Sequence, residues 1–226
     1  MIKVMVVDDQ RLMREGLATI IGMEKDLEIV GLASNGLEAY KSALESKPDV
    51  ILMDIRMPVA DGVEGTRLVR RNLPDIKVLM LTTFDDSELI FNALEQGAHG
   101  YLLKEMPSET IVSAIHTVHS GGMVFQPSVT AQILEEIKKL NGKEGREAPP
   151  TPEPRHALLN QLSEREMEVL RLLGRGMNNK EIARELTITE GTVKNHVSNL
   201  IAKLDFRDRT QIAVFAVRQG IVNFEP

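Results

Sequence analysis

The stretch Val50-Ile-Leu-Met-Asp54-Ile-Arg-Met-Pro58-Val-Ala-Asp61-Gly62 decides the fold, because an apolar run ends there in one carboxylate and a turn follows. A short apolar run bounded by turn residues is typical of a buried parallel strand. Asp54 then lies at the carboxyl end of that strand, where open α/β sheets bind their ligands. A single aspartate at such a place is ordinarily a turn former. Whether Asp54 has a chemical function therefore depends on which other residues lie beside it.

Three other apolar runs also end in chemically capable residues, namely Asp8-Asp9, Thr82 and Lys104. Segments with a helical apolar period separate these runs, and this alternation predicts a doubly wound α/β domain with a five-stranded parallel sheet and right-handed crossovers. The carboxyl ends of four strands then share one edge, where these residues and Asp54 converge. The predicted strands are residues 2–7, 27–33, 50–53, 78–81 and 100–103, and the predicted helices are residues 11–23, 37–46, 63–72, 86–96 and 108–119.

A second, all-helical domain is predicted at residues 156–226. Ser163-Glu-Arg-Glu166 is a capping box that opens its first helix. Asn178 or Asn179 caps a second helix, Thr189 caps a third that reaches about Leu204, and a fourth covers residues 211–219. Two short helices, a tight turn and a longer third helix have the shape of helix-turn-helix DNA readers.

The predicted domain boundaries follow from a change in composition. Residues 1–122 form the sheet domain, residues 123–155 the connection, and residues 156–226 the helical domain. Within the connection, residues 124–140 have the apolar spacing of one more helix, and residues 141–154 are rich in Gly, Glu and Pro. Such a segment is typical of a semi-extended linker.

Composition narrows the class of protein. The 226 residues include no Cys, which leaves no disulfide and no thiolate metal site. No apolar stretch is long enough to span a bilayer, and the N-terminus becomes acidic too soon for a signal peptide. We therefore expect a cytoplasmic protein without a membrane partner. The absence of Trp and an aromatic content of 4% argue against single-strand recognition by base stacking.

Charge is divided unevenly along the chain. The net charge is −6, but residues 1–140 carry −7 and residues 141–226 carry +1. An acidic part joined to a near-neutral part indicates two domains with different partners.

The acids at the shared sheet edge predict a magnesium site. Three carboxylates at adjoining strand ends repel one another, and a hard cation with oxygen ligands resolves that repulsion. We expect Asp9 and Asp54 to be direct ligands of Mg²⁺, Asp8 to bind directly or through water, and the backbone carbonyl of Arg56 to be a further ligand.

The same edge also predicts phosphoryl chemistry. A carboxylate such as Asp54 can attack a phosphoryl group and form an aspartyl phosphate. The Lys104 ammonium can neutralise a phosphoryl oxygen, and the Thr82 hydroxyl can donate to the bound group.

Several motifs resemble those of a known family. The first set resembles the receiver domain of two-component response regulators: Val6-Val-Asp-Asp9, Leu52-Met-Asp54-Ile-Arg-Met-Pro58, Leu81-Thr82 and Gly100-Tyr-Leu-Leu-Lys104. The second set resembles the LuxR-type output domain: Leu162-Ser-Glu-Arg-Glu166, Asn179-Lys-Glu-Ile-Ala183 and Gly191-Thr-Val-Lys-Asn-His-Val197. Together, and in this order, they are similar to the NarL/FixJ family of transcription factors.

The resemblance implies a role for each matching residue. Asp54 is the expected phosphoacceptor, with the acidic pair Asp8 and Asp9 beside it. Tyr101 matches the aromatic switch, whose ring turns inward when Thr82 moves toward the phosphate. The alternative for Tyr101 is a half-buried strand tyrosine. The resemblance also implies a sensor histidine kinase as phosphodonor, and a homodimer that binds pseudo-palindromic double-stranded DNA.

The third helix of the output domain predicts the DNA contacts. Lys194, Asn195 and Ser198 lie roughly on one side of it, where Lys and Asn can reach base edges in the major groove. The helix start can donate to phosphate through Thr192 and the cap at Thr189. Further candidates for contacts with the DNA backbone are Asn178, Lys180, Lys203, Arg207 and Arg209. The alternative for these basic residues is an ordinary solvated helix face.

We expect a regulator and no enzyme activity, and two alternatives compete with this interpretation. A Mg²⁺-dependent phosphohydrolase with an aspartyl-phosphate intermediate needs a general acid beside Asp54, yet Ile55 and Arg56 offer no carboxylate. That alternative also leaves the helical domain unexplained. A DNA binder independent of phosphorylation would have no need for the intact acidic set.

Overall fold

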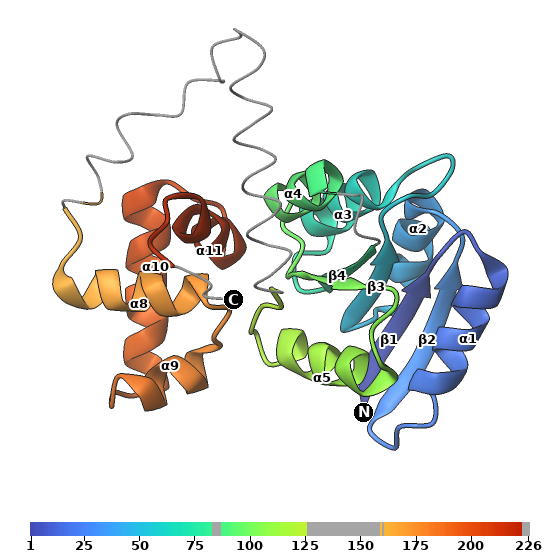
Figure 1. Ribbon diagram of the computed structural model, residues 1–226, viewed down its shortest axis with the longest axis horizontal. Coiled ribbons are helices and arrows are strands. Elements are labelled where there is room, and N and C mark those ends of the chain that lie inside the picture. Colours follow the sequence, from blue (N-terminus) through green and yellow to red (C-terminus); the bar gives the residue numbers. More distant parts are fainter. Residues whose placement is uncertain (83–86, 126–158, 160, 223–226) are drawn as a thin grey trace, which may run out of the picture. The chain divides into compact units, whose positions relative to one another are not determined.

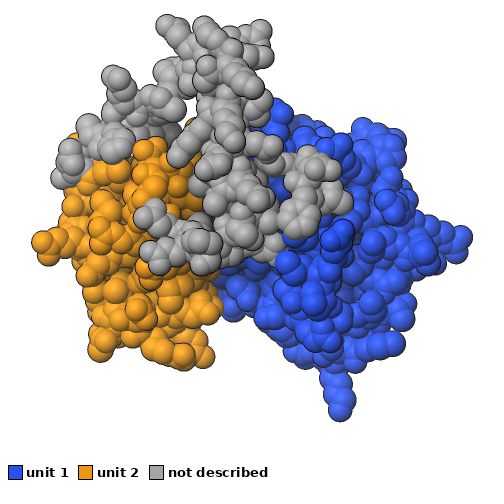
Figure 2. Space-filling view, viewed as in Figure 1, with its two compact units in different colours: residues 1–126 blue, residues 127–226 orange. Residues whose placement is uncertain are grey.

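The computed structural model describes residues 1–82, 87–125, 159 and 161–222 (Figure 1). The chain separates into two compact units, residues 1–126 and residues 127–226 (Figure 2). The predicted helix of residues 124–140 lies outside the described residues from residue 126 on, as does the whole predicted linker of residues 141–154. The predicted domain boundaries therefore stay predictions.

The first unit is a parallel sheet whose strands run in the order β2-β1-β3-β4-β5. This is the flavodoxin-like order of doubly wound folds, and it confirms the predicted fold class. The elements follow one another as β1 (Ile2–Val7), α1 (Arg11–Ile21), β2 (Leu27–Ala33), α2 (Gly36–Ser46), β3 (Val50–Asp54), α3 (Gly62–Asn72), β4 (Lys77–Thr82), α4 (Ser87–Glu95), β5 (Tyr101–Leu103) and α5 (Ser108–His119).

Both faces of the sheet are covered by helices, which is why its strands are apolar without alternation. Successive side chains of a strand point to opposite faces of the sheet. On one face, Val4 and Leu52 pack with Leu17 of α1 and Ile115 of α5. Met5 and Met53, one residue on in β1 and β3, point to the other face, which carries α2, α3 and α4 (Figure 1). Because both faces of the sheet are buried, polar reactive side chains are found at the ends of its strands.

Glycine is required where the chain passes close to two strand ends. A Cβ atom on Gly62 would lie 2.2 Å from the carbonyl oxygen of Asp54. Gly100 has φ +142, and a Cβ atom there would lie 2.1 Å from the carbonyl oxygen of Val124. The N–H of Val124 donates to the His99 carbonyl and the N–H of Tyr101 donates to the Val124 carbonyl, so the chain after α5 extends the sheet beyond β5.

The second unit has the predicted helices, each opened by a side-chain cap. Ser163 and Glu166 form the predicted capping box, and Asn178, not Asn179, caps the second helix. Asp208 accepts from the Gln211 N–H, so the fourth helix begins two residues before its predicted start. The four helices are α8 (Glu164–Gly174), α9 (Asn179–Glu185), α10 (Glu190–Leu204) and α11 (Arg209–Arg218).

One apolar core joins these four helices. Leu170 of α8, Ile182 of α9, Leu200 of α10 and Phe215 of α11 are buried together.

Within the described ranges, no helix combines the length and hydropathy needed to cross a membrane.

Candidate functional site

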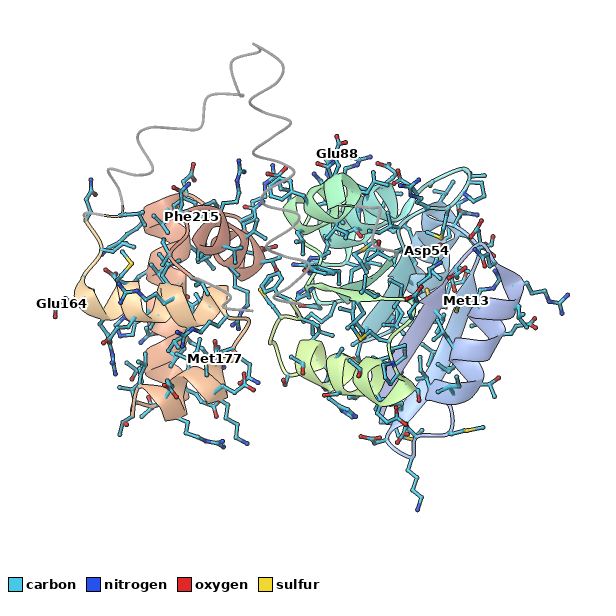
Figure 3. All side chains as sticks on the ribbon, viewed as in Figure 1. Met13, Asp54, Glu88, Glu164, Met177 and Phe215 are labelled. Atoms are coloured by element: carbon cyan, nitrogen blue, oxygen red, sulfur yellow. The ribbon has the colours of Figure 1, made fainter. Side chains whose placement is uncertain are left out.

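The strand ends of the first unit bring the predicted acids and the predicted lysine together. Asp54 ends β3, and Figure 3 labels it at this edge of the sheet. Lys104 Nζ lies 2.9 Å from Asp8 Oδ2 and 2.8 Å from Asp54 Oδ2. Carboxylate oxygens of Asp8, Asp9 and Asp54 all lie within 4.8 Å of one another. Asp8 and Asp54 therefore share the Lys104 ammonium, and Asp9 lies beside them.

Burial shapes the electrostatics of this cluster. Desolvation raises the pKa of Asp54 above its ordinary value, although the hydrogen bond and charge of Lys104 act to lower it. Burial alone would lower the pKa of Lys104, but its bonds to Asp54 and Asp8 outweigh burial and raise it. The lysine therefore keeps its charge, while Asp54 is a less stable carboxylate than one in water.

The Asp8 and Asp9 carboxylates suit a hard cation. Asp8 is fully buried, and its Oδ1 accepts a hydrogen bond from the Gln10 N–H at 2.9 Å. Its Oδ2 has the ionic contact with Lys104 but no well-directed hydrogen bond. Asp9 is exposed beside it. A buried carboxylate oxygen without a hydrogen bond, next to an open carboxylate, is a donor set that Mg²⁺ or Ca²⁺ fits.

Two further predicted residues lie on the neighbouring strands. Thr82 is the last residue of β4 and Tyr101 the first of β5, and both are fully buried. Tyr101 is thus buried more deeply than the half-buried strand tyrosine of the alternative interpretation. Arg56 is exposed two residues after Asp54. The switch role of Tyr101 and the carbonyl ligand at Arg56 stay predictions.

The helix-turn-helix is formed by α9, a tight turn and α10. The turn brings the Ile188 N–H to the Ala183 carbonyl at 2.9 Å, with Thr187 in the left-handed region at φ 54. Helix α10 buries one side, including Val193 and Val197, in the core of the second unit. The predicted base-reading residues Lys194, Asn195 and Ser198 are exposed.

The other predicted DNA contacts divide into two groups. Lys180 and Arg207 are exposed on the surface. Lys203 is exposed as well, but its Nζ lies 2.8 Å from the buried carboxylate of Glu166, and the Arg209 guanidinium donates to the Met177 carbonyl at 2.6 Å. Burial lowers the pKa of Arg209 to about 10.

The side chains that cap α9 and α10 form hydrogen bonds with the first turn of their own helices. The Asn178 side chain accepts from the Glu181 N–H at 2.9 Å. Thr189 Oγ1 accepts from the Thr192 N–H at 3.1 Å and lies 2.9 Å from the Thr192 hydroxyl. These contacts hold the helix starts in place, and they are independent of any DNA.

Comparison with known proteins matches both units. Residues 4–116 match the family described as the response regulator receiver domain, and residues 160–216 match the bacterial regulatory proteins of the luxR family. The transcriptional regulatory protein LnrK of Bacillus subtilis is 56% identical over 99% of this chain and all of its own length. The chain belongs to the response regulators with a LuxR-type output domain. It is therefore a phosphorylation-dependent transcriptional regulator of a two-component system.

Further response regulators resemble it over most of the chain. The response regulator protein VraR of Staphylococcus aureus is 39% identical over 98% of this chain and 99% of its own length. The crystal structure of ChrA, from a heme-sensing two-component system, is 33% identical, covers 97% of this chain and 98% of its own, and has a TM-score of 0.52.

Sequence reasoning missed two parts of the response regulator's sites. Arg14 donates to the backbone carbonyl of Asp8 at 2.5 Å, and the ion pair between Lys203 and Glu166 links residues 37 positions apart. Both cations lie on helices among other charged residues, where the sequence pattern indicates a solvated face. The sequence predicted the capping box at Ser163, but it does not show that Glu166 also forms an ion pair with a lysine of another helix.

Proposed function

We propose that Asp54 of this response regulator accepts a phosphoryl group from a sensor histidine kinase, and that phosphorylation controls DNA binding by α10. The observation that carries the proposal is the position of Asp54, at a strand end 2.8 Å from the Lys104 ammonium and beside two further carboxylates. A DNA-binding regulator works where the chromosome is, so we also propose a cytoplasmic location.

The residues of the site divide the chemistry between them. An Asp54 carboxylate oxygen attacks the phosphorus of a phosphohistidine, the P–N bond breaks, and the imidazole nitrogen leaves with the electron pair and takes up a proton. Lys104, which now contacts Asp54, then neutralises a phosphoryl oxygen, and the Thr82 hydroxyl donates to another. The raised pKa of Asp54 marks a desolvated and more basic carboxylate, which favours its role as the nucleophile.

Asp8, Asp9 and Asp54, with the Arg56 carbonyl, are the proposed ligands of Mg²⁺. When bound, Mg²⁺ neutralises the charge that develops on the phosphoryl oxygens. The chain's own contribution is to hold three carboxylates close together before any cation arrives. This costs stability in the free protein, and it makes cation binding favourable.

We propose that Lys194, Asn195 and Ser198 face the bases, since all three are exposed on one helix. Thr192, the cap at Thr189, Lys180 and Arg207 remain candidates for phosphate contacts. Asn178 and Arg209 make hydrogen bonds inside the domain, so we assign them to holding α9 and α11 in place. Lys203 pairs with Glu166 but is exposed, so it remains a candidate for a phosphate contact.

The small net charge of the output domain implies weak binding by one copy. We therefore propose that phosphorylation produces a homodimer, which binds two half-sites of pseudo-palindromic DNA. Neither the phosphohydrolase nor the phosphorylation-independent binder gains support from the acidic cluster or from the family.

The test uses the full-length protein with acetyl phosphate and Mg²⁺. We expect the mass of one phosphoryl group to be added at Asp54, and no addition in Asp54→Asn. The phosphorylated form should sediment as a dimer and bind operator DNA more tightly than either the unphosphorylated form or the variant. Modification at another residue would contradict the assignment of Asp54, and equal mass and affinity in both states would contradict control by phosphorylation.

A further inference from the structure

We propose that Arg14 is a positioning residue for the cation site. Its guanidinium fixes the peptide plane between Asp8 and Asp9, and so it aims the Asp9 carboxylate at the cation. The proposal rests on the proposed function in that it takes Asp9 to be a ligand of a divalent cation.

The first step is the contact itself. Arg14 Nη1 donates to the backbone carbonyl of Asp8 at 2.5 Å, across six positions of the chain. Arg14 is held in the first turn of α1, because its own N–H donates to the Gln10 carbonyl at 3.0 Å. Its side chain is half-buried, so solvent competes little for the guanidinium.

The second step concerns the rest of Asp8. Its N–H donates to the Ala33 carbonyl at 3.1 Å, its Oδ1 accepts from Gln10, and its Oδ2 contacts Lys104. Neighbouring segments therefore fix the nitrogen and the carboxylate of Asp8. The direction of its carbonyl is set by Arg14.

The third step leads from that carbonyl to Asp9. The Asp8 carbonyl and the Asp9 N–H belong to one rigid peptide plane, so a rotation of that plane redirects the Asp9 side chain. The Asp9 carboxylate is exposed, and among the described residues it has no hydrogen bond or ion pair of its own. The backbone therefore sets the direction of its Cα–Cβ bond, from which the carboxylate reaches the cation. Groups that orient a metal ligand in this way typically change metal affinity by about 10- to 100-fold.

A positioning role and a purely electrostatic role predict opposite results. Arg14 is a cation near a cation site, so by charge alone its removal would strengthen Mg²⁺ binding. If it orients Asp9, its removal weakens binding. Arg11 supplies the matched control, because it starts the same helix, carries the same charge and has an exposed ion pair with Glu15.

The experiment measures Mg²⁺ affinity by calorimetry in the unphosphorylated full-length protein. We expect Arg14→Gln to weaken Mg²⁺ binding about tenfold, Arg14→Lys to recover part of the loss, and Arg11→Gln to bind as the wild type does or slightly more tightly. Acetyl phosphate gives a second readout. In Arg14→Gln the Mg²⁺ concentration for half-maximal phosphorylation should rise, while the rate at saturating Mg²⁺ stays close to that of the wild type.

The outcomes separate this proposal from the one on which it rests. If the wild type binds Mg²⁺ and Arg14→Gln matches Arg11→Gln, the positioning role is refuted and the cation site stands. If the wild type binds no Mg²⁺, the cation site itself is refuted. Thermal unfolding in chelator shows whether Arg14→Gln folds. Should it unfold, Arg14→Lys decides: Mg²⁺ affinity equal to that of the wild type in this variant would mean that the guanidinium is not needed to orient Asp9.

Discussion

Replacing Lys104 by methionine should destabilise the receiver domain when no metal is present. The Lys104 side chain is 12% exposed, and its ammonium lies 2.8 Å and 2.9 Å from two carboxylate oxygens. At an effective dielectric constant of about 20, each contact is worth roughly 6 kcal/mol before desolvation. Desolvation of the ammonium offsets several kcal/mol. Lys104→Met leaves Asp8 and Asp54 repelling each other, and we expect it to cost about 2–4 kcal/mol.

Tyrosine fluorescence in urea can measure this change for the receiver alone. The chain has no Trp and two Tyr, Tyr40 and Tyr101, both in the first unit. With a typical urea dependence of about 1–3 kcal/mol per molar, the midpoint should fall by roughly 1–2 M in the presence of chelator. Lys41→Met, at an exposed position of α2, is the control and should change little. A Lys104→Met protein as stable as the wild type would refute the idea that this ammonium holds the carboxylates together.

Three further predictions concern other parts of the molecule. The hydrogen bond from Lys203 holds the pKa of Glu166 below its ordinary value. The ionised carboxylate therefore stabilises the output domain above about pH 4.5, and this stabilisation is lost as the pH falls through the lower pKa of the folded state. Glu166→Gln should accordingly flatten the acid side of the stability–pH curve of the output domain, measured by circular dichroism. Gly100→Ala should destabilise the receiver by about 1–3 kcal/mol in urea, because its φ of +142 and the Val124 carbonyl leave no room for a Cβ atom. If Lys194 contacts a base edge, Lys194→Ala should weaken operator binding by about 1–3 kcal/mol and relax the sequence preference at one base pair. An equal loss of affinity on all sequences in gel shifts would instead mean that Lys194 contacts phosphate.

The sequence predicted the order and type of the elements well, because periodicity and turn residues determine them locally. The third strand was predicted at residues 50–53 and observed as Val50–Asp54. Helix α1 ends at Ile21, two residues before its predicted end, and Gly22 follows as its C-cap. The convergence of Asp8, Asp54 and Lys104 was also predictable, since parallel strands place their carboxyl ends on one edge.

Contacts that depend on side-chain reach across the fold could not be predicted. Lys203 was assigned to DNA from its charge and helix face, and that pattern does not show that it also pairs with Glu166 of another helix. Arg14 had no assigned role, because nothing in the local pattern shows that its guanidinium returns to the carbonyl of Asp8. The pair of Lys203 and Glu166 depends on the packing angle between α8 and α10, which is determined by the whole core. The contact of Arg14 depends on how the chain turns between β1 and α1, and on which rotamer the arginine adopts there.

The crowded carboxylates also bear on the free energy that the proposed switch needs. A shift of a two-state equilibrium from 1:99 to 99:1 needs about 5.5 kcal/mol of differential stabilisation. Lys104 divides its ammonium between Asp8 and Asp54 in the free protein, and each contact is worth roughly 6 kcal/mol before desolvation at an effective dielectric constant of about 20. Under the proposed phosphorylation, that ammonium passes to a phosphoryl oxygen, and the difference between the old and the new contact contributes part of the free energy that the shift requires.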